Sequence, residues 1–252
     1  LNFKTLMNID GAEGVIIQEM IKGKEIFIGM KKEAGFPPLI ICGAGGIYVE
    51  IIKDIAYSQS KYGSQLTIYS GLEIEYHYTK ADYYTKFLKD VDYFILGQHV
   101  ISMNKDDQNL VSCFYLETKE EIYRYAETVC DAMQTGMFKI IAHPDIYMDG
   151  YQDFDYHAEQ VAHQICRCAE KTNTILEFNG NGFRRSKHHT PQGYLQPYPR
   201  IEFFNIVEQY NVRTILSSDS HSPKHLYDDT IKEAEAIYNS YKFKKVYSFT
   251  EF

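Results

Sequence analysis

The chain alternates between short apolar runs and longer amphipathic stretches over most of its length. From about residue 58 onward, runs typical of strands lie at 66–70, 92–96, 138–142, 174–178 and 213–217, with a weaker one at 245–249. Stretches whose apolar residues recur at helical spacing separate these runs. Strands that alternate with helices of this length predict βα units and a mostly parallel sheet or barrel.

The clearest of the predicted helices carries its own boundary signals. Thr118 is followed three residues later by Glu121, which is the spacing of a capping box, and Gly136 supplies a stop signal. Between them the apolar residues repeat at helical spacing, at Ile122, Tyr125, Ala126, Val129 and Met133. Further amphipathic helices are expected over 157–171, 201–211 and 228–241.

The first 57 residues follow a different pattern. Residues 14–32 contain two apolar runs joined by the turn-like Lys22-Gly23-Lys24, which predicts a hairpin. Residues 38–58 then predict a strand, a glycine-rich turn and a short helix, and the polar stretch 58–65 has the composition of a junction. The pattern therefore predicts two unlike domains, residues 1–57 and residues 58–252.

Composition narrows the classes of function. A length of 252 residues with 44% hydrophobic content suits one large α/β domain, or one domain and a fragment of another. The formal net charge of −8 argues against broad nucleic-acid binding, which needs cations to neutralise phosphates. No apolar run is long enough to span a bilayer, and the first residues lack the layout of a secretion signal. Five cysteines at irregular spacing predict reduced thiols in a cytoplasmic protein, and Cys166 and Cys168 face different directions on their helix.

Side chains of metal-ligand type follow several of the predicted strands. They are Glu73, His99, His143, Asp219 and His221. A single histidine after a strand is commonly a hydrogen-bonded structural residue, but four βα units end in this way. Because parallel α/β folds gather their chemistry at the carboxyl ends of their strands, we expect one shared metal site. Imidazoles and carboxylates suit Zn, Fe and Mn.

A basic loop follows the predicted strand at 174–178. The segment LEFNGNGFRRSKHH contains Arg184 and Arg185 and, close behind them, Lys187, His188 and His189. The guanidinium forms a planar fork that suits phosphate, and the loop belongs to the same edge as the predicted metal ligands. The sequence therefore predicts a phosphate-binding loop, with a solvated basic loop as the alternative.

The order of these motifs resembles the PHP superfamily, and its histidinol-phosphatase branch most of all. SGLEIEY, ILGQHVI, IIAHPD, LEFNGNGFRR, YPRIEFF and SSDSHSP carry the resemblance, which covers about residues 62–252. It implies a distorted (β/α)7 barrel with two or three ions of Zn, Mn or Fe. By motif, the ligands would be the five residues named above, with Asp219 and His221 also catalytic. Arg184, with Arg185 beside it, would bind the substrate phosphate.

The beginning of the chain departs from that family and resembles another. No histidine precedes His77, so the His-x-His strand that normally opens the family is missing and the barrel is expected to be incomplete. Instead, GVIIQEMIKGKEIFIGMKK and CGAGGIYVEIIKDIAYS resemble the end of the ATP-grasp domain of NDP-forming acyl-CoA synthetases, over about residues 12–57. In that family the residue matching Asp54 would help to bind the nucleotide's magnesium, whereas on a fragment it would be a surface residue.

These observations support three hypotheses. The first is a metal-dependent phosphomonoesterase that acts on a small phosphorylated substrate, as the resemblance to histidinol phosphatases implies, with weaker metal loading than a complete relative. The second is another PHP-type phosphoesterase, acting on nucleotides or nucleic-acid ends. The third is an inactive truncated or fused barrel with a structural or interaction role.

Overall fold

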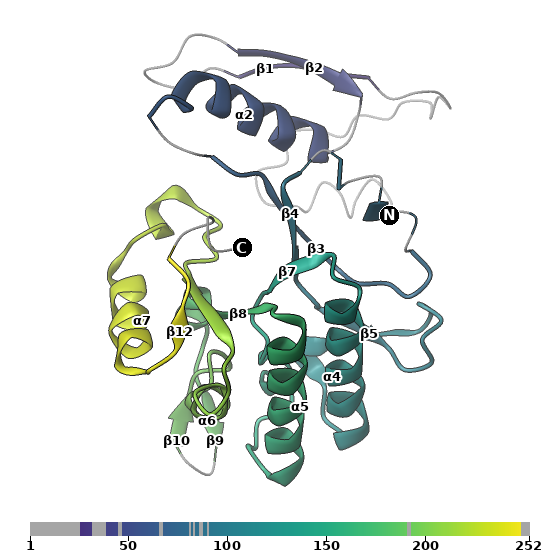
Figure 1. The fold of residues 1–252 in the computed structure, drawn as a ribbon, viewed down its shortest axis with the longest axis vertical. Coiled ribbons are helices and arrows are strands. Elements are labelled where there is room, and N and C mark those ends of the chain that lie inside the picture. Colours follow the sequence, from purple (N-terminus) through teal and green to yellow (C-terminus); the bar gives the residue numbers. More distant parts are fainter. Residues whose placement is uncertain are drawn as a thin grey trace, which may run out of the picture. The chain divides into compact units, whose positions relative to one another are not determined.

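The computed structural model describes residues 26–31, 39–44, 47–65, 68–80, 82, 84–85, 88–89, 91–190 and 193–247 (Figure 1). The chain divides into two compact units, residues 1–68 and residues 69–252. The boundary between the units therefore lies after Ile68, whereas composition predicted a junction after Tyr57.

The described part of the first unit consists of a two-stranded antiparallel sheet and a helix. Strand β1 (Ile26–Lys31) pairs with β2 (Leu39–Ala44), and helix α2 (Ile47–Tyr62) follows. The helix continues through the polar stretch that begins at Ser58, because neither glycine nor proline interrupts it before Gly63. The predicted turn at residues 22–24 lies outside the described residues, as does the apolar run before it, and so does the side chain of Asp54.

The second unit is built on a six-stranded parallel sheet whose spatial order follows the chain order. Each strand is added beside the one before it, as in a barrel wound in one direction. This confirms the predicted parallel α/β architecture, and the strand positions agree with the apolar runs, except that the first strand lies at 71–74, after the run predicted at 66–70. The strands are β3 (Gly71–Ile74), β4 (Tyr93–Leu96), β7 (Phe138–Ile141), β8 (Ile175–Asn179), β11 (Arg213–Ser217) and β12 (Lys244–Lys245).

Helices fill the connections between these strands. Helix α4 begins after Thr118, whose hydroxyl accepts a hydrogen bond from the backbone N–H of Glu121, and both bonds of the predicted capping box are present. After this helix, Gly136 adopts a φ of 71°, which glycine reaches without steric cost. The helices are α4 (Lys119–Gln134), α5 (Tyr156–Thr172), α6 (Ile201–Val207) and α7 (Asp229–Ser240).

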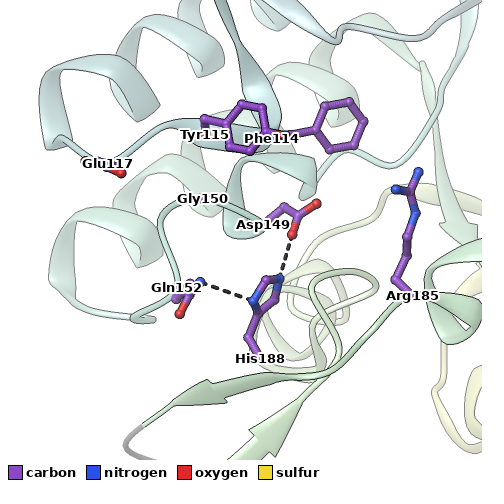
Figure 2. A pocket seen from close by; sticks show the side chains of 8 residues that line it. All are labelled: Phe114, Tyr115, Glu117, Asp149, Gly150, Gln152, Arg185 and His188. Carbon is purple, nitrogen blue, oxygen red and sulfur yellow. Dashed lines mark hydrogen bonds and ion pairs between the residues drawn. The ribbon is translucent and has the colours of Figure 1, made fainter. Parts of the chain in front are cut away.

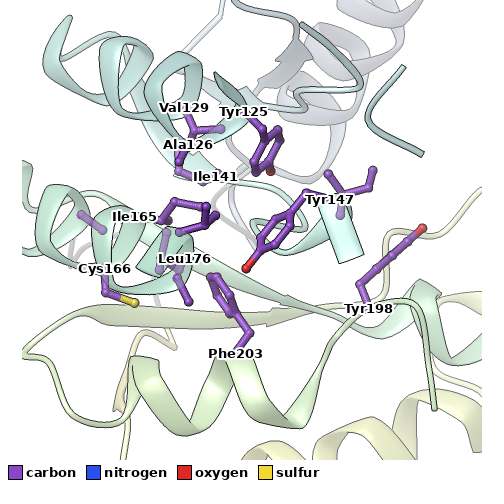
Figure 3. Packing of buried hydrophobic residues seen from close by; sticks show 14 of the residues in the cluster. Tyr125, Ala126, Val129, Ile141, Tyr147, Ile165, Cys166, Leu176, Tyr198 and Phe203 are labelled. Atoms are coloured by element: carbon purple, nitrogen blue, oxygen red, sulfur yellow. The ribbon is translucent and has the colours of Figure 1, made fainter. Parts of the chain in front are cut away.

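The two faces of the sheet carry different side chains. The face that packs on the helices contributes the fully buried Leu96, Ile141 and Leu176 to the main apolar core. Ile141 and Leu176 lie among side chains from α4, α5 and α6 (Figure 3). Because side chains alternate along a strand, the neighbouring positions point to the opposite face. That face holds a small apolar cluster of Ile140, Ile175 and Val246. The strand carboxylates Glu73 and Glu177 belong to it, because they pair in register with Ile95 and Ile215.

Short elements accumulate after the carboxyl ends of the strands. Two antiparallel pairs lie there, β5 (Val100–Ser102) with β6 (Leu110–Ser112) and β9 (His188–Thr190) with β10 (Gly193–Leu195). Short 3₁₀ helices complete this rim, namely η1 (Cys113–Tyr115), η2 (Ile146–Met148), η3 (Gly180–Arg184) and η4 (Pro223–His225). The rim therefore combines a rigid sheet edge with loops that can supply binding groups.

Candidate metal centre

Three ligand-type side chains from three neighbouring strands converge at the rim. His143 Nε2 lies 3.6 Å from Glu73 Oε1, and His99 Nε2 lies 3.9 Å from the same oxygen. One ligand atom from each of these residues lies within 4.8 Å of the other two. Ligand atoms about 2.1 Å from a shared tetrahedral ion are about 3.4 Å apart, so this spacing fits one cation. Within the described residues, this is the one group of three or more potential His, Cys, Asp or Glu ligands.

Glu75 fixes the orientation of His99. Its carboxylate lies 3.0 Å from His99 Nδ1 and also accepts hydrogen bonds from the backbone N–H groups of His99 and Val100, at 3.0 and 3.3 Å. The ring of His99 also packs on the ring of Phe114, with centroids 5.8 Å apart. Nδ1 of His99 is therefore hydrogen-bonded to Glu75, and Nε2 is left to face Glu73. A hydrogen bond of this kind on one ring nitrogen is what orients metal-ligating histidines.

His143 is buried and enters the group from a strained backbone. Its φ is 32°, in the left-handed region, and the following proline prevents the strand from continuing. Burial alone would lower the pKa of His143. The hydrogen bond to Glu73 and the negative charges of Glu177, Glu73 and Asp219 outweigh burial, so the pKa is raised. An environment that favours an imidazolium in this way also favours a bound cation.

Glu177 joins the ends of three strands through one buried carboxylate. Its Oε2 accepts hydrogen bonds of 2.8 Å from the backbone N–H of His143 and from Asn179 Nδ2, and its Oε1 accepts one from the hydroxyl of Ser217. Burial raises the pKa of Glu177, while the charge of His143 and these hydrogen bonds partly offset that effect. Sequence reasoning missed this residue, although a glutamate within an apolar strand next to a predicted site was the available signal.

The other two predicted ligands lie outside the group of three. Asp219 Oδ2 accepts hydrogen bonds from Asn179 and Asn181, at 3.1 and 3.2 Å, and its charge contributes to the raised pKa of His143. The side chain of His221 is 77% exposed, with Nδ1 3.0 Å from the backbone oxygen of Asp219. The structure thus brings three of the five predicted ligands together, places Asp219 at their border and leaves His221 in solvent.

The two adjacent arginines of the basic loop occupy different environments. Arg184 donates to Asp228 Oδ1 at 2.9 Å and to the backbone oxygens of Ser218 and His225, so it ties η3 to the start of α7. The guanidinium of Arg185 instead lies over two aromatic rings, 5.5 Å from the centroid of Phe114 and 5.8 Å from that of Tyr198. Arg185 is therefore placed beside the metal group, because the same rings pack on His99 and His143.

A pocket of about 460 Å³ opens next to this arginine. Figure 2 shows His188 at its wall, hydrogen-bonded at 2.6 Å to Asp149 and at 3.1 Å to Gln152. Arg185 lies across the pocket from them. The complete lining consists of Phe114, Tyr115, Glu117, Asp149, Gly150, Gln152, Arg185 and His188. The pocket thus offers one guanidinium beside the metal group, two carboxylates and an aromatic wall.

A second buried acid lies behind the metal group. Asp145 is fully buried, and its Oδ2 accepts a 2.6 Å hydrogen bond from the backbone N–H of Arg200, while Oδ1 has no hydrogen-bond partner among the described residues. Burial raises the pKa of Asp145 to about 7 from an ordinary value of 3.8, and the hydrogen bond from Arg200 offsets part of that effect. Arg200 also pairs with Glu202, and its charge and that of His143 offset only part of the effect of burial on Asp145.

Comparison with known proteins separates the two units. Residues 2–68 match the sequence model of the ATP-grasp domain. The acetate–CoA ligase [ADP-forming] I of Archaeoglobus fulgidus is 42% identical over 62 residues, covering 22% of this chain and 9% of that protein. The 4-hydroxybutyrate–CoA ligase [ADP-forming] of Nitrosopumilus maritimus is 56% identical over 46 residues, covering 18% of this chain and 7% of that protein. The chain thus spans less than a tenth of these two relatives, and the predicted resemblance of the N-terminal part is confirmed.

The fold of the chain is similar to that of a solved phosphatase. The crystal structure of histidinol phosphate phosphatase from Lactococcus lactis subsp. lactis, complexed with zinc, L-histidinol and phosphate, superposes with a TM-score of 0.54. The two are 19% identical, and the match covers 81% of this chain and 77% of the other. The predicted fold is confirmed. No helix among the described residues is long and apolar enough to cross a membrane.

Substitution of Gly97 tests the geometry of the metal group. A Cβ at this position would collide with the carboxylate of Glu73, which would have to leave its present position in the metal group. We expect Gly97→Ala to weaken zinc binding by about 10–100-fold, the range seen when a ligand's support is lost. A chromophoric chelator in competition measures the affinity. Gly136→Ala strains the end of α4 without meeting any atom within 4 Å, so it should leave the affinity unchanged. Equal affinities for both variants would contradict this geometry.

The raised pKa of Asp145 predicts a pH dependence of stability. The folded state holds the proton of Asp145 more tightly than the unfolded state does. The contribution of this proton to the free energy of unfolding is therefore fully present below about pH 4 and is lost as the pH rises through about 7. Asp145→Asn removes this titration and keeps the amide oxygen as an acceptor. We expect the variant to gain stability relative to the wild type, by a few kcal/mol, between pH 4 and pH 8. Urea unfolding in the presence of a chelator measures it, and parallel pH curves would refute the assignment.

Proposed function

We propose that this chain is a metal-dependent phosphomonoesterase that acts on a small phosphorylated substrate, with histidinol phosphate as the first candidate. The observation that carries the proposal is the convergence of Glu73, His99 and His143 beside a pocket that presents Arg185. The fold shared with a phosphatase whose structure holds zinc, histidinol and phosphate supports it. The function follows from the site, because a fold alone does not determine chemistry.

The residues divide into those that hold a cation and those that hold the substrate. Glu73, His99 and His143 would hold a divalent ion such as Zn, Mn or Fe, which when bound lowers the pKa of water and polarises phosphoryl oxygens. Glu75 and Glu177 keep two of these ligands in place through hydrogen bonds. Asp219 is proposed as a further ligand at the border of the group. His221 would join only after turning inward from solvent.

Arg185 is the group that would bind the phosphate. Its guanidinium lies over the rings of Phe114 and Tyr198, and these contacts lower the entropy lost when it pairs with an anion. Asp149 and Glu117 give the pocket beyond it a negative character that suits a cationic organic group. His188 is kept in place by Asp149 and Gln152 and shapes the wall. A small phosphate ester would thus lie with its phosphate toward the metal group and its organic part toward these acids.

Other occupants of the pocket remain hypotheses that the same assay separates. Mononucleotides offer a phosphate but no cationic group to match Asp149. Long polynucleotides are disfavoured by the net charge of −8. ATP chemistry in the first unit is not proposed, because its match to the CoA ligases covers less than a tenth of either relative.

Phosphate release tests the proposal. Chelator-treated protein is loaded with Mn²⁺ or Zn²⁺ and given histidinol phosphate or nucleoside monophosphates. We expect metal-dependent release that is fastest from histidinol phosphate and is abolished by a chelator. His143→Ala should lower kcat/KM by more than the roughly 10–100-fold that losing an outer-shell partner costs. The matched control, His157→Ala on α5, should retain activity. A folded protein that binds no transition metal and releases no phosphate would support the non-enzymatic hypothesis instead.

The two neighbouring arginines provide a matched pair of variants. Arg185→Ala should raise KM by about tenfold or more, because a charge-assisted hydrogen bond to phosphate contributes about 1.5–3 kcal/mol. Its thermal stability should change little. Arg184→Ala should lower the melting temperature instead, because it breaks the link between η3 and Asp228. Steady-state kinetics and thermal unfolding of both variants decide the assignment, and a raised KM for Arg184→Ala alone would reverse it.

A further inference from the structure

Two cysteines that are far apart in the sequence lie together between neighbouring helices. Cys130 belongs to α4 and Cys168 to α5, and these two helices pack directly against one another. Cys168 Sγ lies 3.6 Å from the backbone oxygen of Cys130, and Cys130 Sγ lies 3.8 Å from that of Gln164 on α5. The two thiols also lie close enough for each to shift the pKa of the other. Each sulfur is therefore directed toward the backbone of the other helix.

The electrostatic environment makes the two thiols unequal. The neighbouring Cys130 thiol, a hydrogen bond from Gln134 and the charge of Lys171 lower the pKa of Cys168, against the opposing effect of burial. The hydrogen bond to Cys168 and burial raise the pKa of Cys130. Cys168 is also the more accessible of the two, since Cys130 is only 7% exposed. A thiolate is the nucleophilic form of cysteine, so Cys168 has the character of an attacking residue and Cys130 that of a protonated partner.

The surroundings of the pair do not match a metal site. A structural zinc site needs four ligands, and the group of potential ligands found in the described part of the chain is the one at Glu73, His99 and His143. Cys166, two residues before Cys168, is fully buried and its pKa is raised by that burial. Two thiols with no further ligands and unequal acidity are the arrangement of a redox pair.

We propose that Cys130 and Cys168 form a reversible disulfide between α4 and α5 when the protein meets a hydroperoxide. The Cys168 thiolate attacks the terminal oxygen of the hydroperoxide, the O–O bond breaks, and the departing alkoxide or hydroxide takes up a proton. This leaves a sulfenic acid on Cys168. The Cys130 sulfur then attacks the sulfur of Cys168, the S–O bond breaks, and the released hydroxide takes the Cys130 proton to become water. Two thiols are oxidised to one disulfide, and one hydroperoxide is reduced.

The pair lies away from the candidate metal centre. Cys130 and Cys168 occupy the last turns of their helices, which lead into the starts of β7 and β8. His99 and His143 follow the opposite, carboxyl ends of the strands. Oxidation of the two cysteines can therefore be measured independently of phosphatase activity.

Peptide mapping of the full chain tests it. The reduced protein is treated with a small excess of hydrogen peroxide, its remaining thiols are blocked with N-ethylmaleimide, and it is digested with trypsin without reductant. Cleavage at Arg167 separates Cys166 from Cys168, so the peptides 125–139, 140–167 and 168–171 each carry one of the three candidate cysteines. We expect 125–139 linked to 168–171, a loss of two hydrogen masses from the intact chain, and full reversal by dithiothreitol.

Single variants assign the roles of the two sulfurs. In Cys130→Ser the sulfenic acid on Cys168 should persist and be trapped by dimedone, whereas in Cys168→Ser Cys130 should stay reduced at the same peroxide concentration. Cys166→Ser is the matched control and should form the same linked peptide as the wild type. A link through Cys166, or oxidation of Cys168 to sulfinic acid in the wild type with no linked peptide, would overturn the proposal. The wild-type mapping decides the question even if a serine variant fails to fold.

Discussion

The rim of the sheet depends on one buried carboxylate. Glu177 is the one charged residue of β8, and it accepts hydrogen bonds from the carboxyl ends of the strands on both sides as well as from Asn179 of its own strand. Such a group is costly to bury unless its oxygens are satisfied, and here backbone and side-chain donors satisfy both. The bond to the backbone of His143 also stabilises the left-handed turn that carries that imidazole toward Glu73. The metal group therefore rests on a polar network that the apolar core alone could not position.

Around this network, some polar residues form hydrogen bonds within the protein and others are available to bind a ligand. Glu75, Asn179 and Arg184 form hydrogen bonds with other parts of the protein, whereas Glu73, His99 and the buried His143 converge on one another and Arg185 lines the pocket. Aromatic rings link the two sets, because Phe114 contacts both His99 and Arg185, and Tyr198 contacts both His143 and Arg185. Substitution of one binding group would therefore also alter the packing of its neighbours, because they contact the same aromatic rings.

Much of this arrangement could be predicted from the sequence, where the signal is local. The capping box at Thr118 and Glu121 is encoded within four residues, and the strands at 93–96, 138–141 and 213–217 are compact apolar runs. The meeting of Glu73, His99 and His143 follows from parallel strands. What could not be predicted depends on packing across the fold. Adjacent arginines diverge because a 3₁₀ turn directs them differently, and periodicity does not reveal that Cys168 meets Cys130 on another helix rather than Cys166 on its own.

The position of β3 in the sheet affects how readily the metal group opens. Of the described strands, only β4 pairs with β3, so β3 lies at the edge of its sheet and carries Glu73 there. Edge strands that are hydrogen-bonded on one side open locally at a lower free energy than central strands do. His99 and His143 follow strands that are paired on both sides. A cation shared by all three would therefore link the most easily opened strand of the sheet to its rigid centre, and the lifetime of the bound ion would be set by the fraying of β3.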